Sequence, residues 1–160
     1  ATEYWWAGMR SLGDNAMSCP ANYAVAQLHT QQPMYQYFFQ HITKYANDHE
    51  GLVIHGSELP FVLHIKNIFF NIKDRKMADI MSSYWINFLL SESGDPNEHH
   101  AGSKYLPDWP QYTYTNPSVL NIIDYDNITP VQSLKKTECD FWIPFVDQSI
   151  RDSTNNIHKS

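Results

Sequence analysis

Apolar side chains recur with a helical period between residues 74 and 92, in the stretch DRKMADIMSSYWINFLLSE. Spacings of three and four residues place such side chains on one face of a helix. The stretch therefore predicts a helix that covers a core and is ended by Gly94. Its core-facing positions are Met77, Ile80, Met81, Tyr84, Trp85, Phe88 and Leu89. Core packing accounts for this stripe of methionine and aromatic side chains better than a cofactor site does.

A shorter run, MYQYFFQH at residues 34–41, is apolar on both faces at its centre, as a buried parallel strand is. The segment before it predicts a helix that Ser18 caps, that holds Pro20 in its first turn and that ends near Gln32. One parallel strand does not make a sheet, so its neighbours are expected to come from another chain. The order of helix, strand, loop and helix favours the α/β class.

The last third of the chain carries more turn signals. The stretch YTYTNPSVLNII, residues 112–123, predicts two short strands around a turn at Asn116-Pro117. The stretch SLKKTECDFWIPFV predicts a final helix that Pro144 kinks or ends, and the polar tail at 151–160 is expected to be loose. We find no repeat or linker, so the sequence predicts one domain or part of one.

Charge and hydropathy exclude several classes of partner. The 160 residues carry 11 Lys and Arg against 17 Asp and Glu, a net charge of -6, with no dense basic run. Nucleic acid and anionic membranes are therefore poor partners. No apolar stretch approaches the roughly 20 residues of a transmembrane helix. The start, ATEYWWAGMR, lacks an initiator Met and a signal-peptide pattern, so we expect a processed chain or one that begins inside a longer precursor.

Two cysteines and one sequon bear on the compartment. Cys19 and Cys139 match no CxxC pattern and are either free buried thiols or a disulfide pair. Asn127-Ile128-Thr129 is an acceptor sequence for N-glycosylation and points to the secretory route, although Pro130 follows it directly.

The eight histidines do not form a metal pattern. The densest group, Glu98-His99-His100, lacks the spaced further ligands of a zinc site and is better explained as a solvated turn. His41, His49 and His64 show no ligand spacing and are assigned to surface or loop roles. The chain also lacks the G-x-S-x-G, Walker A, GxGxxG and HExxH motifs. No metal or cofactor is expected, and no nucleophile elbow is present.

His55 stands in the stretch VIHGSELPFVL, residues 53–63. A single histidine is more often structural than catalytic. The catalytic histidine of an α/β hydrolase, however, follows the serine and the acid in the chain and lies on a loop after a late strand. His55 has that position relative to the strand at 34–41.

Several segments carry a family resemblance together, in order and with family-like spacing. They are GDNAMSCP at 13–20, MYQYFFQH, HGSELPFVL, the YWINF helix, GDPN at 94–97, WPQY at 109–112 and CDFW at 139–142. With these segments the chain resembles the C-terminal third of the type-B carboxylesterase and cholinesterase family. The resemblance covers residues 11 to about 146.

The resemblance implies roles for particular residues. His55 matches the triad histidine of the family's His-Gly-x-Glu segment, and Gly56 would allow the tight turn there. Glu58 matches a family position near the site and would support the residues that contact the substrate. Cys19 and Cys139 match a disulfide pair. Cholinesterases have an aromatic residue at Ser57, so this chain is more similar to general carboxylesterases, although His64 replaces a glycine that often follows in them.

The resemblance also implies that the chain is part of a larger hydrolase domain. Residues 1–160 would be the C-terminal part of a single α/β-hydrolase domain, inactive alone and completed by an N-terminal chain with the serine, the acid and the oxyanion hole. Such a protein would be a secreted or lumenal serine carboxylesterase that acts on a small ester without a cofactor. Some relatives have lost the serine, so a non-catalytic cholinesterase-like adhesion, structural or storage protein is the alternative.

Overall fold

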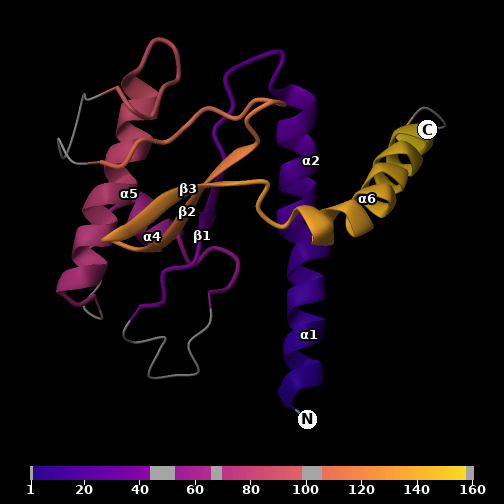
Figure 1. The fold of residues 1–160 in the computed structure, drawn as a ribbon, viewed down its shortest axis with the longest axis horizontal. Helices are drawn as coiled ribbons and strands as arrows, with labels where there is room; N and C mark the ends of the chain where they lie inside the picture. Colours follow the sequence, from indigo (N-terminus) through magenta and orange to yellow (C-terminus); the bar gives the residue numbers. More distant parts are fainter. Residues whose placement is uncertain (1, 44–52, 66–69, 99–105, 158–160) are drawn as a thin grey trace. The chain divides into compact units, whose positions relative to one another are not determined.

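The computed structural model describes residues 2–43, 53–65, 70–98 and 106–157, which form helices and one sheet (Figure 1). They divide into two compact units. One unit, Pro33–Gln132, contains the sheet and, among its described residues, the helices α4 (Leu59–Val62) and α5 (Ile72–Leu90). The other combines the two ends of the chain, Ala1–Gln32 and Ser133–Ser160, and is helical. The α/β class expected from the sequence is thus present as a small mixed fold.

The sheet has three strands in the order β1 (Tyr37–Phe39), β2 (Ser118–Asp124) and β3 (Asn127–Gln132). β1 and β2 are parallel, with Tyr37 opposite Leu120, whereas β2 and β3 are antiparallel. The strand predicted at 34–41 is confirmed. The expectation that all of its neighbours come from another chain is wrong, because β2 is a parallel neighbour within this chain. On its other edge, β1 pairs with no strand of the described residues.

The predicted hairpin turn at Asn116-Pro117 is also wrong. The hairpin turns at Tyr125-Asp126, and residues 112–115 form no strand. Asn116 instead closes a turn before β2, since its backbone N–H donates to the Thr113 hydroxyl at 3.0 Å. Pro130 lies inside β3, a position that an edge strand tolerates because one row of its backbone groups needs no ladder partner.

Helix α5 (Ile72–Leu90) packs against the sheet and confirms the helix predicted from the periodic stretch (Figure 1). Its start is fixed by a reciprocal cap. The Asn71 side chain accepts from the backbone N–H of Lys73 and Asp74, while the Asp74 carboxylate accepts from the N–H of Asn71. Such a cap satisfies helix-end donors that would otherwise be unpaired.

The core lies between α5 and the strands. Its buried members include Phe39, Phe61, Phe70, Met77, Met81, Tyr84, Trp109, Leu120 and Ile122. Two of the positions predicted to face the core do not, because Phe88 is 45% and Leu89 75% exposed. The helix ends at Leu90, and Gly94 follows in a left-handed turn with φ +70°. The last turn of α5 therefore extends beyond the sheet that covers its middle.

The helical unit comprises α1 (Thr2–Gly13), the π-helical turn η1 (Asp14–Ser18), α2 (Cys19–Leu28) and α6 (Lys136–Ile157). The helical run before residue 19 was not predicted. Ser18 lies inside it with helical backbone angles and forms no cap hydrogen bond, so its predicted capping role is wrong. Pro144 lies inside α6, which continues to Ile157 through the tail expected to be loose.

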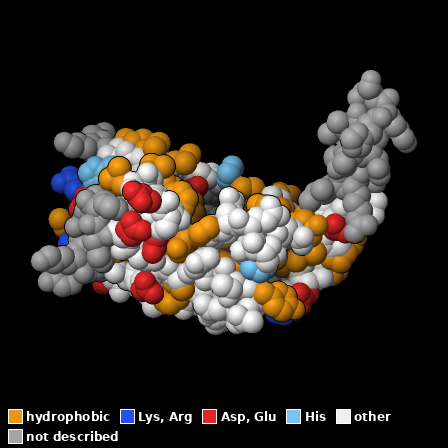
Figure 2. Space-filling model, turned by 90° about the horizontal axis from the view of Figure 1, so that it is seen from above, with side chains coloured by type: hydrophobic (Ala, Val, Ile, Leu, Met, Phe, Trp, Pro, Cys, Tyr) orange, Lys and Arg blue, Asp and Glu red, His pale blue; other side chains and the backbone are white. Residues whose placement is uncertain are grey.

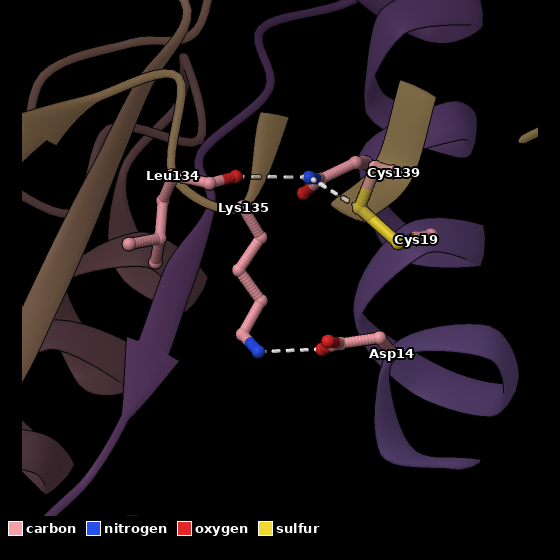
Figure 3. Close-up of a disulfide and its surroundings, with 6 residues drawn as sticks. Asp14, Cys19, Leu134, Lys135 and Cys139 are labelled. Carbon is pink, nitrogen blue, oxygen red and sulfur yellow. Dashed lines mark hydrogen bonds and ion pairs between the residues drawn. A yellow bond between two sulfur atoms is a disulfide. The ribbon is translucent and has the colours of Figure 1, made fainter. Parts of the chain in front are cut away.

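The predicted disulfide between Cys19 and Cys139 is present and joins α2 to α6 with a Cα–Cα distance of 5.0 Å (Figure 3). Polar contacts surround it. The Asn22 side-chain amide donates to the Leu134 carbonyl at 3.2 Å and to Cys139 Sγ at 3.4 Å. Lys135 Nζ lies 2.5 Å from the Asp14 carboxylate. The Tyr23 hydroxyl also donates to the Asp147 carboxylate at 2.8 Å, so the disulfide and several polar contacts together hold the helical unit.

Large hydrophobic side chains lie on the surface of both units, and many are visible in Figure 2. In the helical unit the most exposed include Tyr4, Leu12, Phe141 and Phe145, and in the other unit Ile54, Leu63, Ile72 and Leu89. Scattered apolar residues are ordinary on a protein surface, but large contiguous apolar patches mark contact sites. None of the described helices is both long and apolar enough to span a bilayer.

Candidate active site

His55 begins a tight turn, residues 55–58, that leads directly into the short helix α4 (Leu59–Val62). The turn is held by its own backbone. The Ser57 N–H donates to the Ile54 carbonyl at 3.0 Å, and the Leu59 N–H donates to the Gly56 carbonyl at 3.1 Å. The Ser57 hydroxyl accepts from the Ile54 N–H at 2.9 Å. These bonds fix the direction in which the backbone presents His55.

Gly56 has φ +83°, in the left-handed region that side chains with a Cβ rarely adopt. An added Cβ would have room, since its nearest neighbour is Leu59 Cδ1 at 3.6 Å. The need for glycine here is therefore a matter of backbone conformation rather than of space. This agrees with the role of Gly56 that the sequence predicts, which is to permit a tight turn beside the histidine.

The imidazole of His55 is exposed and makes no hydrogen bond or ion pair with the residues that the structure describes. A histidine acts as a general base when one ring nitrogen reaches the proton to be removed and the other is oriented by a partner. Neither ring nitrogen of His55 is bound by a residue that the structure describes. The turn exposes the imidazole of His55. No described serine or carboxylate bonds to it, as the other members of a triad would.

Glu58 is half-buried at the start of α4 and lies near Tyr37 of β1. Burial raises the pKa of Tyr37 to about 12, and the negative charge of Glu58 adds to that shift. Tyr37 is therefore a neutral phenol at physiological pH. No described contact joins Glu58 to His55, so the support from Glu58 that the sequence predicts stays a prediction.

The structure corrects the role assigned to another histidine. His41 is not a surface residue, because it is 5% exposed and its Nε2 lies 2.8 Å from the buried Asp74 carboxylate. His64 is a surface residue and pairs with the exposed Asp79. His49 lies outside the described residues. The sequence did contain a signal for one member of this pair. The spacing from Asn71 to Asp74 is that of a helix cap, and it places the Asp74 carboxylate at the start of a helix.

No group of three or more His, Cys, Asp or Glu side chains that could hold a metal ion occurs among the residues described. Of the histidine-rich stretch at 98–100, Glu98 is described and the two histidines are not. The chemistry that the described part of the site supports is proton transfer by an imidazole.

The sequence of the chain is similar to those of known proteins. A mouse protein, pyrethroid hydrolase Ces2a, is 27% identical over 149 residues, which are 88% of this chain and 25% of the mouse protein. A rat protein, pyrethroid hydrolase Ces2e, is 28% identical over 152 residues, which are 88% of this chain and 24% of the rat protein. The chain thus spans about a quarter of the length of these curated relatives. The model of the carboxylesterase family matches residues 2–142, a range that includes the His55 turn and both cysteines, and the chain therefore belongs to the carboxylesterase family.

Proposed function

We propose that the chain is the C-terminal part of a serine carboxylesterase and that His55 is its general base and acid. The observation that carries the proposal is an exposed imidazole, without partners among the described residues, on a rigid turn inside the stretch matched by the family. A serine hydroxyl is a weak nucleophile at neutral pH, and a neighbouring imidazole is its usual activator. His55 is the residue of this chain best placed for that task.

The reaction would proceed in two steps. His55 takes the proton of the serine hydroxyl as the oxygen attacks the ester carbonyl, and returns it to the departing alcohol. A water molecule then loses its proton to His55 and attacks the acyl-enzyme, which releases the acid and restores the serine. The serine, the acid that orients His55 and the oxyanion hole would come from the N-terminal partner. Pyrethroid-type esters are the first substrates to test, because both rodent relatives are named as pyrethroid hydrolases.

A fluorophosphonate probe tests this function, because it reacts covalently with an activated serine. Applied to the complete protein that contains residues 1–160, it is expected to label one serine outside this chain, identified by sequencing the labelled peptide. Protein denatured before the probe is added is the control and should remain unlabelled. A native protein that takes up no label would contradict the catalytic proposal and favour the adhesion, structural or storage alternative.

The partner itself is a second expectation. β1 has an edge that pairs with no described strand, and Tyr4, Trp5 and Leu12 of α1 are exposed. Uncovered apolar surface and an open strand edge favour association or aggregation. We expect residues 1–160 expressed alone to lack a cooperative unfolding transition and sharp near-UV circular dichroism. Co-expression with the N-terminal part should restore both, and a cooperative isolated chain would contradict the need for a partner.

The sequon fits a secretory protein, which we also propose. Asn127 and Thr129 are both exposed at the start of β3, whereas Ile128 between them is buried. We expect protein from secreting cells to lose mass on treatment with peptide N-glycosidase F, and Asn127→Gln to abolish that loss. Asn116→Gln is the matched control, because Asn116 is equally exposed but precedes a proline and is no sequon. If the mass of the protein is the same before and after treatment with the glycosidase, glycosylation at Asn127 is refuted.

A further inference from the structure

His41 lies between two carboxylates in the interior of the sheet-containing unit. Its Nε2 is 2.8 Å from Asp74 Oδ1, and its Nδ1 is 3.4 Å from Asp124 Oδ1. A neutral imidazole has one N–H, whereas the imidazolium has two, so both carboxylates face a donor when the ring is charged. Lys73 Nζ lies 3.7 Å from the other oxygen of Asp124.

Each carboxylate is itself held by the backbone of a different element. Asp74 is 1% exposed at the start of α5, where its second oxygen accepts from the Asn71 N–H at 2.9 Å. Asp124 is the last residue of β2, and its Oδ1 accepts from the Tyr125 N–H at 2.8 Å. His41 follows β1 by two residues. The cluster therefore joins the ends of two parallel strands to the beginning of a helix.

The ring of His41 also contacts α4, the helix that the His55 turn enters. Its centroid lies 5.3 Å from that of Phe61, at an interplanar angle of 86°. Phe61 is 1% exposed and stacks on Phe70 with centroids 4.6 Å apart. Edge-to-face contacts of this kind are favourable and orient the rings. A fixed His41 thus limits where Phe61, and with it α4, is placed.

We propose that His41 is a positioning residue for the His55 turn. Asp74 and Asp124 hold its ring, the ring holds Phe61, and Phe61 anchors α4 immediately after the turn. The anchor lies at the carboxyl ends of β1 and β2, the edge of a parallel sheet at which active sites are commonly found. The expected effect on turnover rests on the proposed esterase function, whereas the effect on the turn itself does not.

The chain provides a matched control. His64 and Asp79 form a pair with the same Nε2–Oδ1 distance of 2.8 Å, but their side chains are 50% and 69% exposed. Like His41, His64 pairs with an aspartate of α5. His64 also lies two residues after the end of α4. An exposed pair contributes little to stability, whereas breaking a buried one is costly. His41→Gln and His64→Gln therefore make the same substitution in a buried and in an exposed histidine–aspartate pair, and the His41 ring also faces Asp124 and Phe61.

Hydrogen exchange in the complete protein tests the positional effect. In His41→Gln we expect the amides of Ser57 and Leu59, which close the turn, to exchange at least about tenfold faster than in the wild type. In His64→Gln they should exchange at the wild-type rate. Equal rates in His41→Gln and wild type, or equal acceleration in both variants, would overturn the inference. If His41→Gln does not fold, Asp124→Asn is measured in its place, with the same two outcomes.

Kinetics test the catalytic effect. A displaced catalytic group lowers kcat, so His41→Gln is expected to lose about 10²-fold in kcat with little change in KM. His64→Gln should retain both constants. If the wild-type protein has no esterase activity and takes up no fluorophosphonate, the proposed function fails while the exchange experiment still decides the role of His41. If His41→Gln loosens the turn but keeps its kcat, positioning for catalysis is refuted.

Discussion

Ester turnover by the complete protein is expected to fall about 10⁴-fold or more when His55 is replaced by Gln, because the proposed base would no longer take the serine proton as the oxygen attacks. The fold should be unchanged, since the His55 side chain is exposed and the turn is held by backbone bonds and by Ser57. Steady-state hydrolysis and fluorophosphonate labelling measure the loss, and circular dichroism verifies the fold.

The control for this prediction is His64→Gln, which removes an exposed imidazole nine residues further along the chain. It should leave turnover close to the wild-type value. If His55→Gln keeps turnover within about tenfold of the wild type, the imidazole is not the base, because such a change is too small for loss of a triad member.

Removing the disulfide is expected to cost about 4–5 kcal/mol of unfolding free energy in the chain-entropy model, since the bond closes a loop with a sequence separation of 120. The variant is Cys19→Ser with Cys139→Ser, which also avoids leaving a lone thiol. The change should appear as a lower denaturant midpoint in the complete protein. Cys139 is 2% exposed and Cys19 fully buried, so two buried hydroxyls add to the cost.

Lys136→Ala is the control for the disulfide prediction. Lys136 forms an exposed ion pair with Asp140 on the same helix as Cys139, and its loss should cost no more than about 1 kcal/mol. A double serine variant that unfolds at the wild-type midpoint would refute the stabilising role. Non-reducing peptide mapping, which should yield one fragment that contains both cysteines, tests the bond itself.

Local patterns predicted the elements whose signals are strong. The periodic stretch predicted α5, and the aromatic run predicted β1. The hairpin was misplaced because Tyr125-Asp126 contains neither glycine nor proline, whereas Asn116-Pro117 has strong turn chemistry and turns the chain before the strand rather than between strands. Pro144 was expected to kink or end the last helix, and α6 does not end there but continues to Ile157. In each case the neighbouring structure overrode a local preference.

In the candidate site, too, local features could be predicted from sequence and contacts between distant residues could not. The turn at Gly56 could be predicted from sequence because a turn is a local structure and glycine marks its conformation, whereas the catalytic role of His55 stays a prediction. His41 was assigned to a surface or loop role because its partners, Asp74 and Asp124, are distant in the chain and approach it only in the folded unit. Which groups complete the site around His55 could not be read from these 160 residues, since no described group contacts its imidazole.

The disulfide sets an order of events during biosynthesis. Cys139 is made 120 residues after Cys19, a delay on the order of ten seconds at usual rates of translation. The sheet-containing unit lies between the two parts of the helical unit in the chain, so it is synthesised before the second of these parts, which contains Cys139. Cys19 cannot form its native bond before the end of that interval. Oxidation of this bond is therefore a late step that closes the helical unit after the strands have been synthesised.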